Sequence, residues 1–222
     1  MNVNEFQDLV KKGSLEEVKA ALRTDPSLAT ALNASGQSSF ILAKYYRQDA
    51  VASYLFGILP MLDIFEASVA GQTESVLAKL NENPDLLESR NGDGWTPLHL
   101  AAFFGTPELI NALIDRGAAV DARSSNAMAN TPIHAAVAGG KKENVEALAK
   151  RGANVNAQQH GGWTALHGAA QAGNREMVEV LIANGADLKA RAENNQSPLD
   201  LALQKGHGPV AALLEQLGAQ LG

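Results

Sequence analysis

The sequence predicts an all-α solenoid of about seven helix–turn–helix units, on two periodic markers and an ordinary globular composition. Four related tetrads, each opening on Thr or Ser, recur with a period of roughly 33 residues, and a glycine follows each tetrad at a constant distance. The 222 residues are 45% hydrophobic and 19% charged. Two markers with one period indicate stacked repeats. The tetrads are Thr96-Pro97-Leu98-His99, Thr131-Pro132-Ile133-His134, Thr164-Ala165-Leu166-His167 and Ser197-Pro198-Leu199-Asp200, and the glycines are Gly117, Gly152, Gly185 and Gly218.

Each unit is expected to begin with a short helix capped by the Thr or Ser of its tetrad. The hydroxyl caps free N–H groups, and proline's fixed φ suits the first helical turn. This helix ends by a glycine, as at Gly105. A second helix, such as residues 176–182, has apolar residues at helical spacing and ends at the next glycine, where a positive φ is tolerated. The stretch that remains before the next tetrad is too short for another helix and predicts a hairpin-like turn, or finger.

The same repeat pattern also divides the first part of the chain into units. The pattern from Gly13 to Leu28 recurs from Gly71 to Leu86, with a shortened unit between the two copies. The shortened unit lacks a finger, because its second helix, expected at about residues 50–58, soon meets the cap of the next helix at Asp63. The units therefore start near residues 4, 38, 62, 96, 131, 164 and 197.

The repeat pattern resembles the ankyrin repeat. The resemblance rests on the Thr-Pro-Leu-His tetrad, the pair Ala101-Ala102, the turn glycine Gly105 and the Gly-Ala-x-Val-Asn stretch at residues 152–156. It implies antiparallel helix pairs stacked into a curved solenoid whose concave face and fingers bind partners. We expect one domain over residues 1–222, with an N-terminal cap at 1–36 and a C-terminal cap at 197–222 whose helix ends at Gly218.

Charge and cysteine content exclude several classes of function. The 18 basic and 24 acidic residues give a net charge of −6, which disfavours nucleic acid and anionic membranes as partners. The chain has no cysteine, so thiol catalysis and Cys-ligated metals are excluded. No secretory signal or apolar membrane span is evident, and a cytoplasmic location is expected.

The recurring histidines of the tetrads are the first candidates for a metal site. Equivalent positions in neighbouring units should lie about 10 Å apart, whereas zinc–nitrogen bonds are about 2 Å long. We therefore expect these histidines to form local hydrogen bonds. The segment Gly92-Asp93-Gly94 is expected to be a turn, and no catalytic or nucleotide-binding motif is found. The sequence predicts a non-enzymatic protein without a cofactor.

The aromatic residues are distributed unevenly. They make up 5% of the chain, and seven of them lie between Phe6 and Phe65, where their helical placement predicts core packing. The other four, Trp95, Phe103, Phe104 and Trp163, occupy positions that the resemblance makes variable and surface-facing. They predict an accessible contact patch. The alternative is packing, with each tryptophan flat on the adjacent finger and Phe104 filling a gap between units.

The predicted function is a preorganised surface that binds an unidentified protein partner, in a chain that is itself monomeric. One alternative is self-assembly through the last unit or the finger-less edge of the second. Another is an enzyme or small-molecule-binding protein, which would need a deep cleft with convergent polar groups. The candidate partner-binding residues are Asp93, Trp95, Phe103, Phe104, Met128, His160, Trp163 and Gln171.

Overall fold

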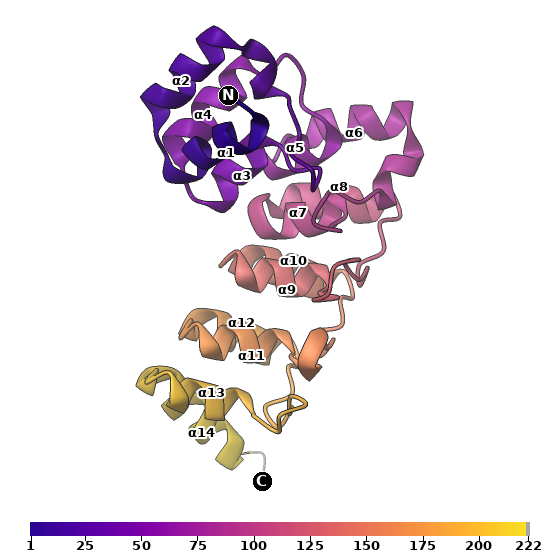
Figure 1. Cartoon of the computed structure of the whole chain (residues 1–222). Coiled ribbons are helices and arrows are strands. Elements are labelled where there is room, and N and C mark those ends of the chain that lie inside the picture. Colours follow the sequence, from indigo (N-terminus) through magenta and orange to yellow (C-terminus); the bar gives the residue numbers. More distant parts are fainter. Residues whose placement is uncertain (221–222) are drawn as a thin grey trace.

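The computed structural model describes residues 1–220, so the last two residues of the predicted domain and C-terminal cap lie outside the described residues. Within this range fourteen α-helices form seven antiparallel pairs that stack along the chain (Figure 1). Each first helix begins within two residues of its predicted start. The pairs are α1 (Val3–Lys12) with α2 (Leu15–Thr24), α3 (Ser39–Tyr45) with α4 (Asp49–Ile58), α5 (Ile64–Val69) with α6 (Thr73–Glu82), α7 (Pro97–Phe104) with α8 (Pro107–Asp115), α9 (Pro132–Ala138) with α10 (Lys142–Lys150), α11 (Ala165–Gln171) with α12 (Arg175–Ala183), and α13 (Pro198–Gln204) with α14 (Gly208–Gln220).

The fingers are hairpin-like turns, and no strand occurs among residues 1–220. Each turn is closed by a backbone hydrogen bond across its neck, such as the bond from the Asn91 N–H to the Trp95 carbonyl at 3.0 Å. The described fingers are residues 30–38 (finger one), 89–96 (finger three), 116–131 (finger four), 151–164 (finger five) and 184–197 (finger six). Short 3-10 turns accompany three units, at η1 (Pro26–Ala29), η2 (Pro84–Glu88) and η3 (His160–Gly162).

Three of the four periodic glycines end a second helix as expected. Gly117, Gly152 and Gly185 have φ values of 94°, 86° and 88°, a region that favours glycine. The expectation for Gly218 is wrong, because α14 continues through it to Gln220. Glycine can adopt helical angles, so its presence alone does not end a helix.

The buried side chains form two hydrophobic clusters that meet beside the shortened unit. One spans Phe6 to Leu55 and adds Val69 and Leu100, and the other spans Ile64 to Leu214. Phe65 and Trp95 pack against both clusters. Those two side chains therefore link the first two units to the rest of the stack.

The missing finger of unit two brings fingers one and three together. Only residues 59–63 connect α4 to α5, which itself has six residues. The Gln37 Nε2 donates to Asp93 Oδ1 at 2.6 Å. A Cβ atom on Gly92 would overlap the backbone carbonyl of Ser35. Two fingers that lie two units apart in sequence are thus in direct contact.

Core packing of the early aromatic residues is only partly as expected. Phe6 and Phe40 are buried, but Tyr46 and Phe56 are 53% and 41% exposed. The expectation is wrong for those two because Tyr46 follows the end of α3 and Phe56 lies on the outer side of α4, where its ring meets Phe40 at 5.9 Å between centroids.

Candidate functional site

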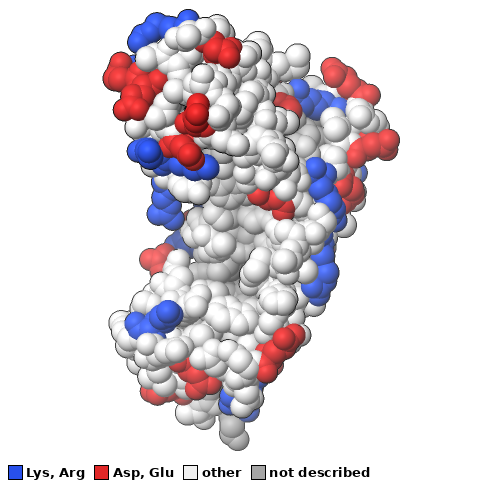
Figure 2. Space-filling model, in the orientation of Figure 1, with Lys and Arg blue, Asp and Glu red and all other residues white. Residues whose placement is uncertain are grey.

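A groove of about 370 Å³ lies where the first helices of units five and six face fingers four and five. Its floor comes from α9 and α11, and its outer wall comes from the fingers. Figure 2 shows the face of the stack hollowed between its two ends. The lining residues are Trp95, Asn126, Met128, Asn130, His134, Val137, Ala138, Gln159, Thr164, Ala165, Gly168, Gln171 and Ala172.

The groove carries no formal charge. None of its lining residues is Asp, Glu, Lys or Arg. Burial lowers the pKa of His134 to about 4, so this ring is neutral at physiological pH. In Figure 2 the hollow is white and most Lys, Arg, Asp and Glu side chains lie toward its margins. An uncharged surface is therefore available on a chain whose net charge is −6.

Comparison of equivalent positions in neighbouring units explains why the floor of the groove is deep at unit five. Ala138 holds the place in its first helix that Phe103 holds in unit four and Gln171 in unit six. A methyl group there leaves a depression between two longer side chains. Gly168 deepens it further, since a Cβ at this position would meet only Val137 Cγ1, at the ordinary contact distance of 3.6 Å. Packing of the repeat does not require glycine at 168.

Carboxamide side chains line both rims of the groove. Gln171 lies on the helix side, and Asn130 and Gln159 lie on the finger side. Asn130 is 7% exposed, and the structure describes no hydrogen-bond partner for its Oδ1 among the protein atoms of residues 1–220. Buried polar atoms are nearly always paired. The Asn130 Oδ1 is thus a buried acceptor without a partner among the described residues, and it is not exposed to the groove.

The tetrad histidines join each first helix to the following finger, which confirms their structural role. In His99 the Nδ1 accepts from the Thr96 N–H at 3.3 Å, and the Nε2 contacts the Asn130 carbonyl oxygen at 3.0 Å. Because a carbonyl only accepts, Nε2 bears the proton and the ring is neutral. His134 and His167 repeat this arrangement with the carbonyls of Trp163 and Gln196.

Burial determines the protonation of these histidines. Desolvation is the main cause that lowers the pKa of both His99 and His134 to about 4, and it lowers that of His167 as well. Their nitrogens are engaged within the repeat. Among residues 1–220, no group of three or more His, Asp or Glu side chains is placed to hold a metal ion.

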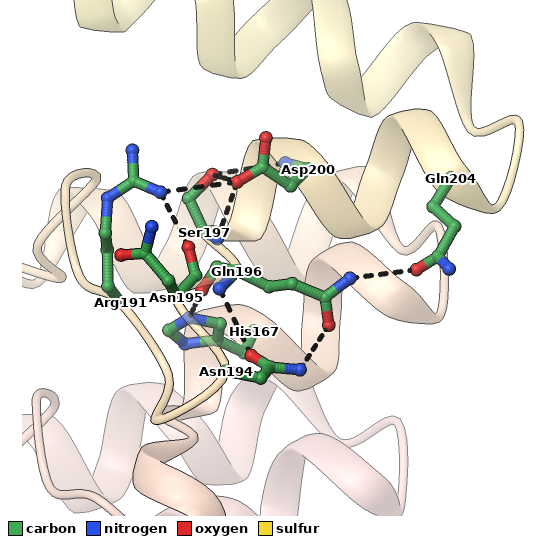
Figure 3. A network of polar contacts seen from close by, with 8 residues as sticks. All are labelled: His167, Arg191, Asn194, Asn195, Gln196, Ser197, Asp200 and Gln204. Carbon is green, nitrogen blue, oxygen red and sulfur yellow. Dashed lines mark hydrogen bonds and ion pairs between the residues drawn. The ribbon is translucent and has the colours of Figure 1, made fainter.

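Unit seven replaces the histidine with Asp200 (Figure 3). The Asp200 Oδ2 accepts from the Ser197 backbone N–H at 2.9 Å and from its hydroxyl at 2.7 Å, and these bonds are the main cause that lowers the Asp200 pKa. Arg191 lies 3.5 Å from the same oxygen. The Gln196 carbonyl still receives the His167 Nε2 of unit six, so the link between units persists without a histidine in the last tetrad.

Three of the predicted site residues line the groove, and others lie beside it. Trp95, Met128 and Gln171 are lining residues. Asp93 lines a second, neighbouring pocket, which Trp95 also lines. His160 is exposed at a finger tip, where its backbone N–H donates to the Met128 carbonyl at 2.8 Å. These five positions form one continuous region of the fingers and first helices.

The aromatic patch is a packed cluster that holds units two and four together. Tyr45 lies 6.0 Å from Trp95, 5.5 Å from Phe103 and 4.8 Å from Phe104 between ring centroids. Burial, with a smaller contribution from the charge on Asp93, raises the pKa of the Tyr45 phenol. The helix between these units, α5, has only six residues and carries the small residues Ala67, Ser68 and Ala70 at its C-terminal end. Aromatic rings from units two and four therefore meet past that end.

Trp95, Phe103 and Phe104, which were predicted to form an accessible contact patch, are thus half-buried rings that pack on Tyr45. The gap-filling alternative for Phe104 is confirmed. Both tryptophans are half-buried, and Trp163 lies over the ring of His167 at 5.9 Å, outside the groove lining. Trp95 alone of the four has a place in both the cluster and the groove.

Sequence reasoning missed Asn130, Val137, Ala138 and Gly168. Alignment of the tetrads does contain a signal for the floor, since Gly168 stands where unit four has Leu100 and Ala138 stands where it has Phe103. No sequence signal marks Asn130, because its importance depends on which atoms its side chain leaves unpaired.

Comparison with known proteins agrees with this architecture. A family model described as "Ankyrin repeats (3 copies)" matches residues 64–159, and one described as "Ankyrin repeats (many copies)" matches residues 148–202. The chain belongs to the ankyrin-repeat family. It is 38% identical over 121 residues to human "Protein phosphatase 1 regulatory subunit 27". That match covers 54% of this chain and 62% of the relative, so the chain spans about three-fifths of the relative's length.

Proposed function

We propose that this ankyrin-repeat chain binds a partner protein through the groove and fingers of units three to seven and catalyses no reaction. The observation that supports this most strongly is the groove itself, which is preformed and has no charged residue in its lining. Ankyrin repeats generally mediate contacts between proteins, and the human relative is named as a regulatory subunit.

Hydrogen bonds between successive fingers support a rigid binding surface. The Arg90 guanidinium donates to the Arg123 carbonyl at 2.7 Å, and Arg123 in turn donates to the Gln158 carbonyl at 2.9 Å. Backbone bonds join the finger tips in the same order, as from the Ser125 N–H to the Gly94 carbonyl at 3.0 Å. A preorganised surface loses little conformational entropy on association, which favours affinity.

The described acids give no support to an enzyme. Glu66 is a buried acid whose pKa is raised, chiefly by desolvation. Its side chain is already used, because Glu66 Oε2 accepts from the Asp63 N–H in the capping box of α5. Glu66 does not line the groove. A perturbed pKa with a structural explanation is weak support for catalysis.

The remaining features of the proposal concern the setting in which the chain acts. We place it in the cytoplasm as a monomer, with neither nucleic acid nor a membrane as partner. No helix within residues 1–220 has the length and hydropathy to cross a bilayer.

Light scattering over a range of protein concentrations tests whether the chain is a monomer. A dimer that forms through unit two or unit seven would favour the alternative of self-assembly.

The binding proposal is tested with two matched glycine substitutions. Gly168→Leu fills the floor of the groove, whereas Gly57→Leu adds the same side chain to an exposed site in α4 with no atom within 4 Å. We expect partners captured from native extract by the wild-type chain to be retained by Gly57→Leu and lost by Gly168→Leu. Protein phosphatase 1 is the first named partner to examine, given the relative's name. Equal capture by both variants would contradict the proposal.

A further inference from the structure

We propose that a second pocket, at the helix–helix turns on the side of the stack opposite to the fingers, binds a free α-amino acid with an aromatic side chain. This turn-side pocket has a volume of about 360 Å³ and lies where α3 and α4 of unit two meet the ends of α5 and α7. It shares no lining residue with the groove, so the inference goes beyond the proposed function and does not depend on it.

One face of α4 forms a wall of the turn-side pocket. Four of its residues line the pocket at the i, i+3, i+4 and i+7 spacing of a single helix face, namely Asp49, Ala52, Ser53 and Phe56. Asp49 is the first residue of α4, and Phe56 follows it after about two turns. The wall is therefore acidic at one end and aromatic at the other.

Phenylalanine rings from three helices make the pocket aromatic. Phe40 of α3 is only 3% exposed, and its ring centroid lies 5.9 Å from that of Phe56. Phe104, the last residue of α7, lines the pocket together with the small residue Ala70. Aromatic rings pack favourably on the edges and faces of other rings. These three rings therefore favour a ligand with an aromatic group.

Two opposite charges line the pocket on either side of the turn between α3 and α4. Lys44 lies one turn after Phe40 in α3, and Asp49 begins α4, so both charges are at the same end of this helix pair. Neither takes part in an ion pair among residues 1–220. The ammonium group of Lys44 is thus available to a carboxylate, and the carboxylate of Asp49 to an ammonium group. An α-amino acid carries both groups beside its side chain.

Exposure of the two charges to water predicts weak binding. Lys44 is half-buried and Asp49 is exposed, and ion pairs near the surface are screened by solvent. For a ligand of this size, such contacts together with the aromatic packing favour a dissociation constant of about 0.1–1 mM. The pocket would therefore be filled only when the free amino acid reaches a comparable concentration.

The pocket is tested with L-phenylalanine as the probe, in saturation-transfer difference NMR of the full chain. Phe56→Ala should weaken binding about fivefold, because it removes a ring from the wall. Ile58→Ala is the matched control, since Ile58 is also 41% exposed in α4 but does not line the pocket. Both variants should melt close to the wild type. No saturable binding to the wild-type chain, or equal binding to all three chains, would overturn the inference.

The two charges are tested with probes that each lack one charge. Phenethylamine keeps the ammonium group, and 3-phenylpropionate keeps the carboxylate. Lys44→Met should weaken L-phenylalanine and 3-phenylpropionate about threefold without weakening phenethylamine. Asp49→Asn should weaken L-phenylalanine and phenethylamine about threefold without weakening 3-phenylpropionate. A loss that both single-charge probes share equally would overturn the roles of Lys44 and Asp49.

A fourth probe separates a free amino acid from an aromatic side chain of a protein. N-acetyl-L-phenylalanine amide has the ring and neither charge, so it should bind about tenfold more weakly than L-phenylalanine. Equal affinity would show that the pocket takes a side chain of a polypeptide, and the proposed ligand class would be wrong. Failure of any of these tests leaves the proposed function intact, because no residue of this pocket lines the groove.

Discussion

Hydrogen bonding of single residues explains how each repeat is joined to the next. Each tetrad histidine uses one nitrogen for its own helix cap and the other for the carbonyl of the following finger. Both bonds require the neutral ring. The stability of the stack therefore depends on keeping three buried imidazoles unprotonated.

Acidification should destabilise the fold through these histidines. The pKa of His99 and His134 is about 4 in the folded chain against an ordinary value of 6.5, so the unfolded chain binds protons more strongly between these values. Their contribution to stability is present above pH 6.5 and lost as the pH falls toward 4, by about 1.4 kcal/mol per pH unit for each ring. Urea unfolding at pH 7.5 and pH 5 measures this loss.

The control for the pH effect is the exposed His160. His160→Ala should unfold with the same dependence on pH as the wild-type chain. A free energy of unfolding that does not change between pH 7.5 and pH 5 would contradict the structural role of the tetrad histidines.

A second residue-scale prediction concerns the close contact of fingers one and three. Gly92→Ala should lower the free energy of unfolding by about 1–3 kcal/mol, because the new methyl group would overlap the Ser35 carbonyl. Gly57→Ala is the control, since its methyl group meets nothing within 4 Å in α4 and should stabilise the helix by roughly 0.5–1 kcal/mol. If Gly92→Ala is as stable as the wild type, the two fingers are not in contact.

At the scale of elements, the loss of one finger is compensated by its neighbours. Finger one reaches finger three through Gln37 and Asp93, and the ends of α3 and α7 meet through aromatic rings. The short helix α5 makes the second contact possible. These contacts cover part of the finger-less edge of unit two, whereas Phe56, Ile58 and Met61 stay exposed there.

The aromatic contact between units two and four should contribute to stability. Phe104→Ala is expected to cost about 2–3 kcal/mol, because it removes a half-buried ring that packs on Tyr45 at 4.8 Å. Phe56→Ala removes the same side chain from a site that is 41% exposed and should cost less than about 1 kcal/mol. Thermal unfolding of both variants measures the difference, and equal melting temperatures would show that the cluster does not support the stack.

For the whole molecule, the sequence could predict the repeat but not the contacts that skip a unit. Caps such as Thr96 and turn glycines such as Gly152 act within a few residues, so their spacing reveals the helix pairs. The packing of Tyr45 on Phe104 depends on the short helix between them, which no local pattern expresses. The unpaired Oδ1 of Asn130 likewise appears only when every neighbouring atom has been placed.

The two hydrophobic clusters describe how the units combine into one molecule. They meet at Phe65 and Trp95, and Trp95 also borders the groove. The single domain over residues 1–222 stays a prediction, under which tryptophan fluorescence and far-ultraviolet circular dichroism should report one coincident unfolding transition. Separate transitions for the two signals would divide the chain at this junction.

The central claim is that a partner occupies the uncharged groove. Hydrogen–deuterium exchange of the full chain, alone and saturated with a captured partner, tests it most directly. The account predicts slower exchange on binding in residues 126–138 and 159–172, which form the fingers and first helices around the groove. Slower exchange confined to the second helices α8, α10 and α12, with no change around the groove, would contradict it.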